Sequence, residues 1–243
     1  MGILSSLFSK DKDPFAKDMV KVCAGQFRIN ITGWGTYQPS DKRKKPVDAI
    51  TVWGCMTGTI TKEYQICKYV VTQKQWKLVM GEGFNPSTQK GDDLPVTDVS
   101  YDDIMKFIKK LNALTGKKYR LPSEAEWMWA AMGASKDKDE GKYAGCNDVK
   151  DLGKYAWIRD DKIHPVGKKK CNELGLYDMS GNVYEICEDM LIKERVVSKE
   201  DYIEKEGNRH LVKGGISEET AKIGYRHWGD SGQFLSFRLA HNV

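Results

Sequence analysis

Residues 175–185 read Gly-Leu-Tyr-Asp-Met-Ser-Gly-Asn-Val-Tyr-Glu, and this stretch decides the fold. Its polar side chains have two interpretations. In the first, Asp178 and Asn182 accept hydrogen bonds from amides of their own loop, as Asx turns do. In the second, the loop supplies some of the several oxygen ligands that a hard cation such as calcium takes. The oxygen donors in the second interpretation are the side chains of Asp178 and Glu185 and the backbone carbonyls near Gly181 and Val183.

Around this segment the chain has the composition of a soluble globular domain. Hydrophobic residues make up 40% and charged residues 30% of its 243 positions, which is typical of neither a disordered nor a membrane-spanning chain. No apolar run approaches the roughly 18 residues that a transmembrane helix requires. The net charge of +5 includes two short basic runs, 42–45 and 168–170, which are next to Pro46 and Gly167 and are typical of loops. We expect no nucleic-acid partner and no transmembrane segment.

The cysteines and histidines do not predict a disulfide framework or a histidine metal centre. The six cysteines are Cys23, Cys55, Cys67, Cys146, Cys171 and Cys187, without a C-x-x-C pair. Such unpatterned cysteines are expected to be free thiols in a reducing compartment. The four histidines are scattered, and none has the i, i+4 spacing that would direct two imidazoles toward one metal ion.

The chain is predicted to have an N-terminal tail, residues 1–17, followed by one domain, residues 18–243. Residues 1–8 are too short for a signal peptide and lack a basic leader. They match the loose M-G-x-x-x-S pattern of myristoylation, and their apolar side chains could dock on a partner or membrane. The favoured interpretation is a frayed start. We therefore expect a cytoplasmic or particle-associated protein.

Three segments predict helices, because each begins with a capping box. The pairs are Thr72 with Gln75, Ser100 with Asp103, and Ser123 with Glu126. The second pair precedes a one-sided apolar stripe that stops at Gly116. Extended segments are expected at 19–30, 49–55 and 59–71, with a turn around Trp34 between two glycines. After Gly133 we expect loops and short strands.

Seven segments, in order along the chain, together resemble the formylglycine-generating sulfatase-enzyme family. Residues 175–185 are similar to its G-L-Y-D-M-x-G-N-V-W-E-W pattern, and residues 120–127 to its R-L-P-T-E-A-E-W helix. The other five segments are residues 71–76, 94–102, 164–167, 212–215 and 237–240. The resemblance covers nearly the whole chain after the tail. It implies an α+β domain of the C-type-lectin-like fold, with limited β-sheet, a few helices and much irregular structure.

The same resemblance carries expectations about metal ions. It implies a calcium site at Asp178, Gly181, Val183 and Glu185, so calcium is the cofactor we expect. The family's oxidases bind copper through two cysteines near the C-terminus, since thiolates suit soft copper(I). Here the last cysteine is Cys187, and the end of the motif departs from the family as Tyr184-Glu185-Ile186. We expect neither copper nor formylglycine-generating activity.

A ligand-binding or display protein is the leading functional hypothesis. The segment from Glu218 to Phe234 is rich in the aromatic and Arg residues that dominate binding hot spots. Its candidate ligand-binding residues are Tyr225, Arg226, His227, Trp228, Asp230, Gln233 and Phe234. Packing of Tyr225 and Trp228 in the core is the alternative.

The expected partner is an unknown protein or surface ligand. Retroelement-diversified proteins, including bacterial and phage receptor-binding proteins, use this lectin-like fold and vary this region, so a variable protein is one version of the hypothesis. A divergent enzyme that uses residues other than cysteine and a structural subunit of a phage or secretion assembly are the alternatives. An enzyme would bring titratable groups together in a pocket, whereas a subunit would expose an apolar interface.

Overall fold

The computed structural model describes residues 13–37, 47–135, 142–191, 198–201, 203–207, 209–229, 232 and 234–243. The described end of the predicted tail packs against the domain. Phe15 is buried, and its ring contacts those of Phe107 and Tyr119. A short 3-10 helix, Ala16–Asp18, then leads into the first strand.

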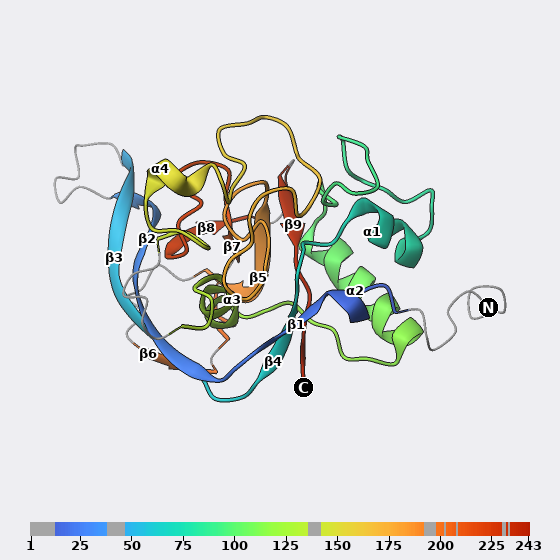
Figure 1. The fold of residues 1–243 in the computed structure, drawn as a ribbon, viewed down its shortest axis with the longest axis horizontal. Coiled ribbons are helices and arrows are strands. Elements are labelled where there is room, and N and C mark those ends of the chain that lie inside the picture. Colours follow the sequence, from blue (N-terminus) through green and yellow to red (C-terminus); the bar gives the residue numbers. More distant parts are fainter. Residues whose placement is uncertain are drawn as a thin grey trace.

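The strands form two sheets (Figure 1). The smaller sheet has the order β1-β4-β10, and all its pairs are antiparallel. The larger has the order β6-β3-β2-β8-β7-β5-β9 and mixes parallel with antiparallel pairs. The strands are β1 Met19–Val22, β2 Gly25–Tyr37, β3 Val47–Ile60, β4 Tyr64–Cys67, β5 Tyr184–Met190, β6 Ser198–Glu200, β7 His210–Lys213, β8 Tyr225–Trp228, β9 Leu235–Phe237 and β10 Ala240–Asn242.

The turn predicted around Trp34 is wrong. β2 continues through Gly33 and Gly35 to Tyr37, in antiparallel register with β3. This pairing has a register shift after Ile31 but resumes beyond it. Glycine has no side chain that would oppose an extended backbone, and ladder hydrogen bonds to the partner strand hold it there. In Figure 1 these two strands form a long curved ribbon along one side of the molecule.

All three predicted capping boxes are present. They open α1 Gln73–Met80, α2 Tyr101–Thr115 and α3 Glu124–Ala131, and in each the serine or threonine accepts a hydrogen bond from the backbone of the third helical residue. α2 ends at Gly116, which has the left-handed conformation that favours glycine. A further single-turn helix, α4, spans Val149–Leu152. These short elements embedded in irregular chain are the α+β arrangement that the sequence predicts.

The core surrounds α3, which lies centrally between the β2–β3 ribbon and strands β5 and β7 (Figure 1). Trp127, Met128 and Trp129 are all buried, so this helix is enclosed on every side rather than amphipathic. A second cluster packs α1 and α2 against the sheet, with the rings of Trp76 and Phe107 stacked 5.0 Å apart. Among the described residues no helix is long and apolar enough to cross a membrane.

Candidate functional site

The segment 175–185 is anchored by a buried ion pair at its end. Arg238 donates from Nε to Glu185 Oε2 at 2.9 Å and from Nη2 to Oε1 at 2.7 Å. The Trp127 indole donates to the same Oε2 at 2.8 Å, which ties β5 to α3. Both charged side chains are fully buried. Glu185 therefore serves first as the partner of Arg238, because a buried charge is tolerated only when it is paired and hydrogen-bonded.

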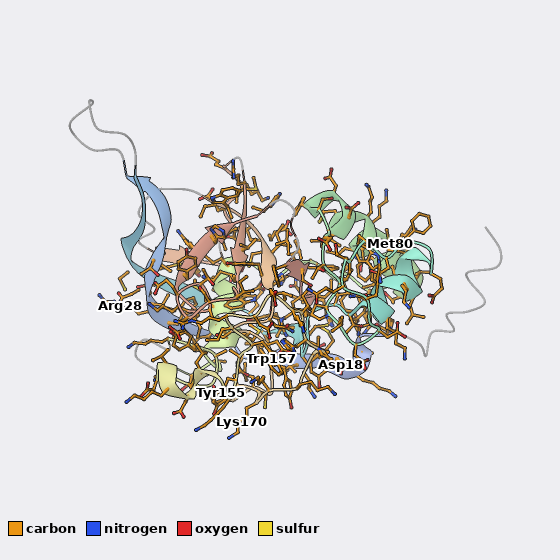
Figure 2. All side chains as sticks on the ribbon, turned by 90° about the horizontal axis from the view of Figure 1, so that it is seen from above. Asp18, Arg28, Met80, Tyr155, Trp157 and Lys170 are labelled. Carbon is orange, nitrogen blue, oxygen red and sulfur yellow. The ribbon has the colours of Figure 1, made fainter. Side chains whose placement is uncertain are left out.

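Asn182 fixes the middle of the segment by bonding a distant backbone rather than the amides of its own loop that the Asx interpretation predicts. Its side chain accepts a hydrogen bond from His164 N at 2.9 Å and donates to His164 O at 3.0 Å. The neighbouring Gly181 has a φ of 92°, and a Cβ there would lie 2.4 Å from the Trp157 carbonyl oxygen. Only glycine fits so close to another backbone. Figure 2 shows Trp157 with Tyr155 and Lys170 along the same edge of the molecule.

Asp178 is a buried carboxylate of the segment with an orphaned oxygen. Its Oδ2 accepts from Gly167 N at 2.8 Å, whereas the buried Oδ1 has no hydrogen-bond partner. Burial raises the pKa of Asp178, and the charge of Glu185 adds to that rise against the opposing effects of Gly167 N and Arg238. Two carboxylates, those of Asp178 and Glu185, therefore lie near the single guanidinium of Arg238.

These features bear on the predicted calcium ion. The orphaned Asp178 oxygen and the surplus negative charge fit a hard cation. Glu185 Oε1 accepts a hydrogen bond from Arg238. A carboxylate oxygen has a second lone pair that a cation could use, but the cation would compete with the positive charge of Arg238. The carbonyl of Gly181 already accepts from Val183 N at 2.8 Å. Within the described ranges no group of three or more His, Cys, Asp or Glu side chains could hold a metal ion, so any ion here would depend on carbonyl ligands.

The predicted display segment is only partly on the surface. Tyr225 is 1% exposed and Arg226 is also buried, so display of these two side chains is wrong. His227 is half-buried and Trp228 is 42% exposed. Phe234 is half-buried and packs against a small cluster with Val183. Asp230 and Gln233 lie outside the described residues.

Arg226 is buried because Glu124, at the start of α3, neutralises it. Its Nε donates to Glu124 Oε1 at 2.7 Å, and its Nη2 donates to Oε2. Lys213, on β7, reaches the same carboxylate at 3.7 Å and donates to the Tyr225 carbonyl at 2.8 Å. Burial lowers the pKa of Lys213 to about 8, and Arg226 adds to this effect while Glu124 opposes it. These charges fix β8 to β7 and to α3.

Four residues that the sequence did not single out as ligand contacts are linked to Trp228 directly or through an intermediate residue. The Arg209 guanidinium lies 3.5 Å from the centre of the Trp228 ring. The Gly229 amide donates to the His210 carbonyl at 3.2 Å, and the rings of His210 and Tyr101 stack at 3.6 Å. His227 lies between Trp228 and Tyr184, with centroid distances of 5.7 and 5.6 Å. We call this set the aromatic face: Tyr101, Tyr184, Arg209, His210, His227 and Trp228. No local pattern links these residues, because they come from α2, β5, β7 with the residue before it, and β8.

The six cysteines are all unpaired as disulfides, as the sequence predicts for free thiols. Cys67 and Cys187 are buried, and burial raises the pKa of both thiols. Since the thiolate is the reactive and metal-binding form, these two side chains are expected to be inert. The other four are partly or fully exposed.

Comparison with known proteins adds a family and a set of relatives. A family model described as sulfatase-modifying factor enzyme 1-like domain matches residues 5–243. Chaperone protein LppX of Paenibacillus barcinonensis is 31% identical, over 51% of this chain and 61% of its own length. The formylglycine-generating enzyme of Thermomonospora curvata is 30% identical, over 47% and 39%. This chain thus spans less than two thirds of either relative.

Two solved structures share the fold over nearly their whole length. Treponema denticola variable protein 1 superposes with a TM-score of 0.72 at 26% identity, covering 93% of this chain and 95% of that one. PvdO from Pseudomonas aeruginosa superposes with a TM-score of 0.68 at 25% identity, covering 96% and 97%. Both therefore carry the same α+β arrangement as the present chain.

Proposed function

Since the chain belongs to the sulfatase-modifying factor enzyme 1-like family, we propose that it is a non-catalytic member that binds a ligand through the aromatic face. Fold does not determine activity, so the argument has to come from the side chains. The observation that carries the proposal is the half-exposed Trp228 indole, covered on one side by Arg209 and flanked by His227. Tryptophan and arginine are the residue types most enriched at binding hot spots.

Two groups that could support catalysis are unsuited to it here: the cysteine pair of the oxidases is missing from the corresponding region of the sequence, and the titrating Lys213 is enclosed in the core. The sequence has no cysteine after Cys187, whereas the oxidases that it resembles use two cysteines in that region. Burial lowers the pKa of Lys213 to about 8, but this lysine is only 1% exposed. A general base must come within hydrogen-bond reach of its substrate, and a side chain enclosed by Glu124 and Tyr225 cannot do so.

The architecture beneath the face suits binding. β8 is held by the buried Arg226–Glu124 and Lys213 contacts, while its last two residues emerge at the surface. A rigid base lowers the entropy that side chains lose when a partner binds. In this proposal the buried charges of Arg226, Glu124 and Lys213 position β8. The side chains of His227 and Trp228, at its end, contact the partner.

The relatives favour a polypeptide partner and a variable surface. One matching protein is named a chaperone and one solved structure a variable protein. We propose that the segment from Glu218 to Phe234, apart from its buried anchors Tyr225 and Arg226, is the diversified region of such a variable protein. A template copy of this segment beside a reverse-transcriptase gene would support the proposal. A genome with this gene and without such a template would refute diversification, although not binding.

Selection from a displayed random-peptide library tests binding directly. Clones enriched on the wild-type protein should bind Trp228→Ala about thirtyfold more weakly, which corresponds to the roughly 2 kcal/mol of a hot-spot aromatic. The matched control is Phe84→Ala, because Phe84 is also an exposed aromatic, at 70%, but follows α1. Clones should bind this control as they bind the wild type. Equal binding to Trp228→Ala and the wild type would refute the proposal.

A further inference from the structure

In the described part of the chain, the Arg209 guanidinium has hydrogen-bond donors that no carboxylate occupies. Its contact there is the Trp228 ring, on which it stacks. Stacking occupies one face of the guanidinium plane and leaves its edge, where the N–H groups point, available to a ligand. This edge matches the two oxygens of a carboxylate. The arginine is thus oriented by an aromatic ring before any ligand arrives.

The other polar groups of the aromatic face are histidine and tyrosine side chains. Burial lowers the pKa of His227, which favours its neutral form, and its Nδ1 is buried without a hydrogen-bond partner. His210 is stacked on Tyr101. Burial raises the pKa of the Tyr101 hydroxyl, and the charges of two nearby acidic residues, Glu188 and Asp102, add to that rise. The acidic side chains lie at the Tyr101 end of the aromatic face, and the guanidinium of Arg209 lies over Trp228.

The number of cations at the ring distinguishes the possible ligands. A nucleic acid or another polyanion gains affinity from several cations together, whereas the described contacts place one guanidinium, that of Arg209, on the Trp228 ring. A single carboxylate needs only one arginine. The indole next to it offers an apolar surface of the kind that buries an aliphatic or aromatic side chain. A short polypeptide stretch supplies both groups.

On these grounds, and resting on the proposed function, we propose that the aromatic face recognises a polypeptide segment in which a carboxylate side chain adjoins an apolar or aromatic one. The carboxylate accepts in-plane hydrogen bonds from Arg209, and the neighbouring side chain packs on Trp228. No bond is made or broken in this recognition.

The test uses two synthetic peptides that differ only in charge. One alternates glutamate with tryptophan, and the other replaces each glutamate by glutamine. Binding is measured by isothermal titration or by NMR shifts of the full chain. The wild type should bind the glutamate peptide at least about tenfold more tightly, and added salt should reduce that preference. Arg209→Gln should lose the preference.

Arg209→Lys keeps the charge but not the planar fork, so it should retain only part of the preference. The control is Arg159→Gln, because Arg159 is an exposed arginine that already pairs with Glu218. It should behave as the wild type does.

Each other outcome overturns this inference in a recognisable way. If both peptides bind equally well and both are lost in Trp228→Ala, the face binds ligands but does not select a carboxylate, and the proposed function stands. If a phosphoserine version binds more tightly than the glutamate version, the ligand class is phosphate. If neither peptide binds up to about 1 mM, the inference fails, whereas the library selection decides separately whether the face binds at all.

Discussion

Two neighbouring aromatics of β8, Tyr225 and Trp228, should respond oppositely to truncation. Tyr225 is enclosed at 1% exposure, so alanine there removes a whole buried ring and leaves a cavity. Such truncations typically cost about 3–5 kcal/mol. Trp228 is 42% exposed, and the Arg209 guanidinium lies over its ring. An exposed cation–π contact is worth about 0.5–1 kcal/mol, so we expect Trp228→Ala to cost less than about 2 kcal/mol.

Urea and thermal unfolding of the two variants and the wild type measure this difference. For a chain of this size, each 1 kcal/mol lowers the melting temperature by about 2–4 °C. Tyr225→Ala should therefore melt about 6–20 °C below the wild type, and Trp228→Ala less than about 8 °C below it. Tyr225→Phe keeps the ring and should stay within about 1 kcal/mol of the wild type, the usual size of one hydrogen bond. An equal or larger loss in Trp228→Ala would show that this indole is part of the core, and the aromatic face would then no longer be the candidate binding surface.

Three further predictions concern copper, calcium and pH. With or without copper, the protein should form no formylglycine in a cysteine-containing sulfatase-type peptide. Formylglycine detected by mass spectrometry above the level of a no-enzyme control would contradict this. If calcium binds at Asp178 in the folded state only, free calcium at about 100 times the dissociation constant should raise stability by roughly 2.7 kcal/mol. Asp178→Asn should abolish that gain, and identical melting of the metal-stripped wild type in calcium and in chelator would exclude the site. Burial lowers the pKa of Lys213 to about 8 from 10.5, so between these pH values the unfolded chain holds a proton that the folded chain has released. The free energy of unfolding should therefore rise across this window relative to Lys213→Met, which lacks this titrating group. Parallel pH profiles of the two proteins would refute this.

The sequence predicts best the features that depend on local hydrogen bonds. Each capping box joins residues three positions apart, so the three helix starts could be found without knowledge of the tertiary structure. The role of Asn182 could not be found in this way, because its side chain bonds the backbone of His164, 18 positions earlier. The turn predicted at Trp34 failed because the continuation of β2 depends on pairing with β3. Cross-strand partners outweigh the local preference of glycine.

Burial along β8 is the feature that the sequence could not supply. A half-buried strand alternates buried and exposed residues. In a strand as rich in aromatic residues as this one, the sequence does not show which residue is the first to be exposed. In β8 both of the first two residues are buried, and exposure increases only at His227 and Trp228. The cause is Glu124, which lies 102 positions earlier in the sequence and pairs with Arg226. A buried guanidinium needs that carboxylate, and spacing within the strand carries no information about it.

The same buried charges explain how a binding surface can be built on a scaffold with little regular structure. Arg238 donates to the carbonyls of Cys67, Lys68 and Tyr177 as well as to Glu185, so one side chain satisfies several backbone groups of irregular chain. Buried carbonyls need such partners, because unpaired polar groups in the interior cost free energy. Lys213 serves the carbonyl of Tyr225 in the same way. The interior thus fixes the backbone by side-chain charges rather than by continuous sheet, and the residues that follow Tyr225 and Arg226 can change without loss of those anchors.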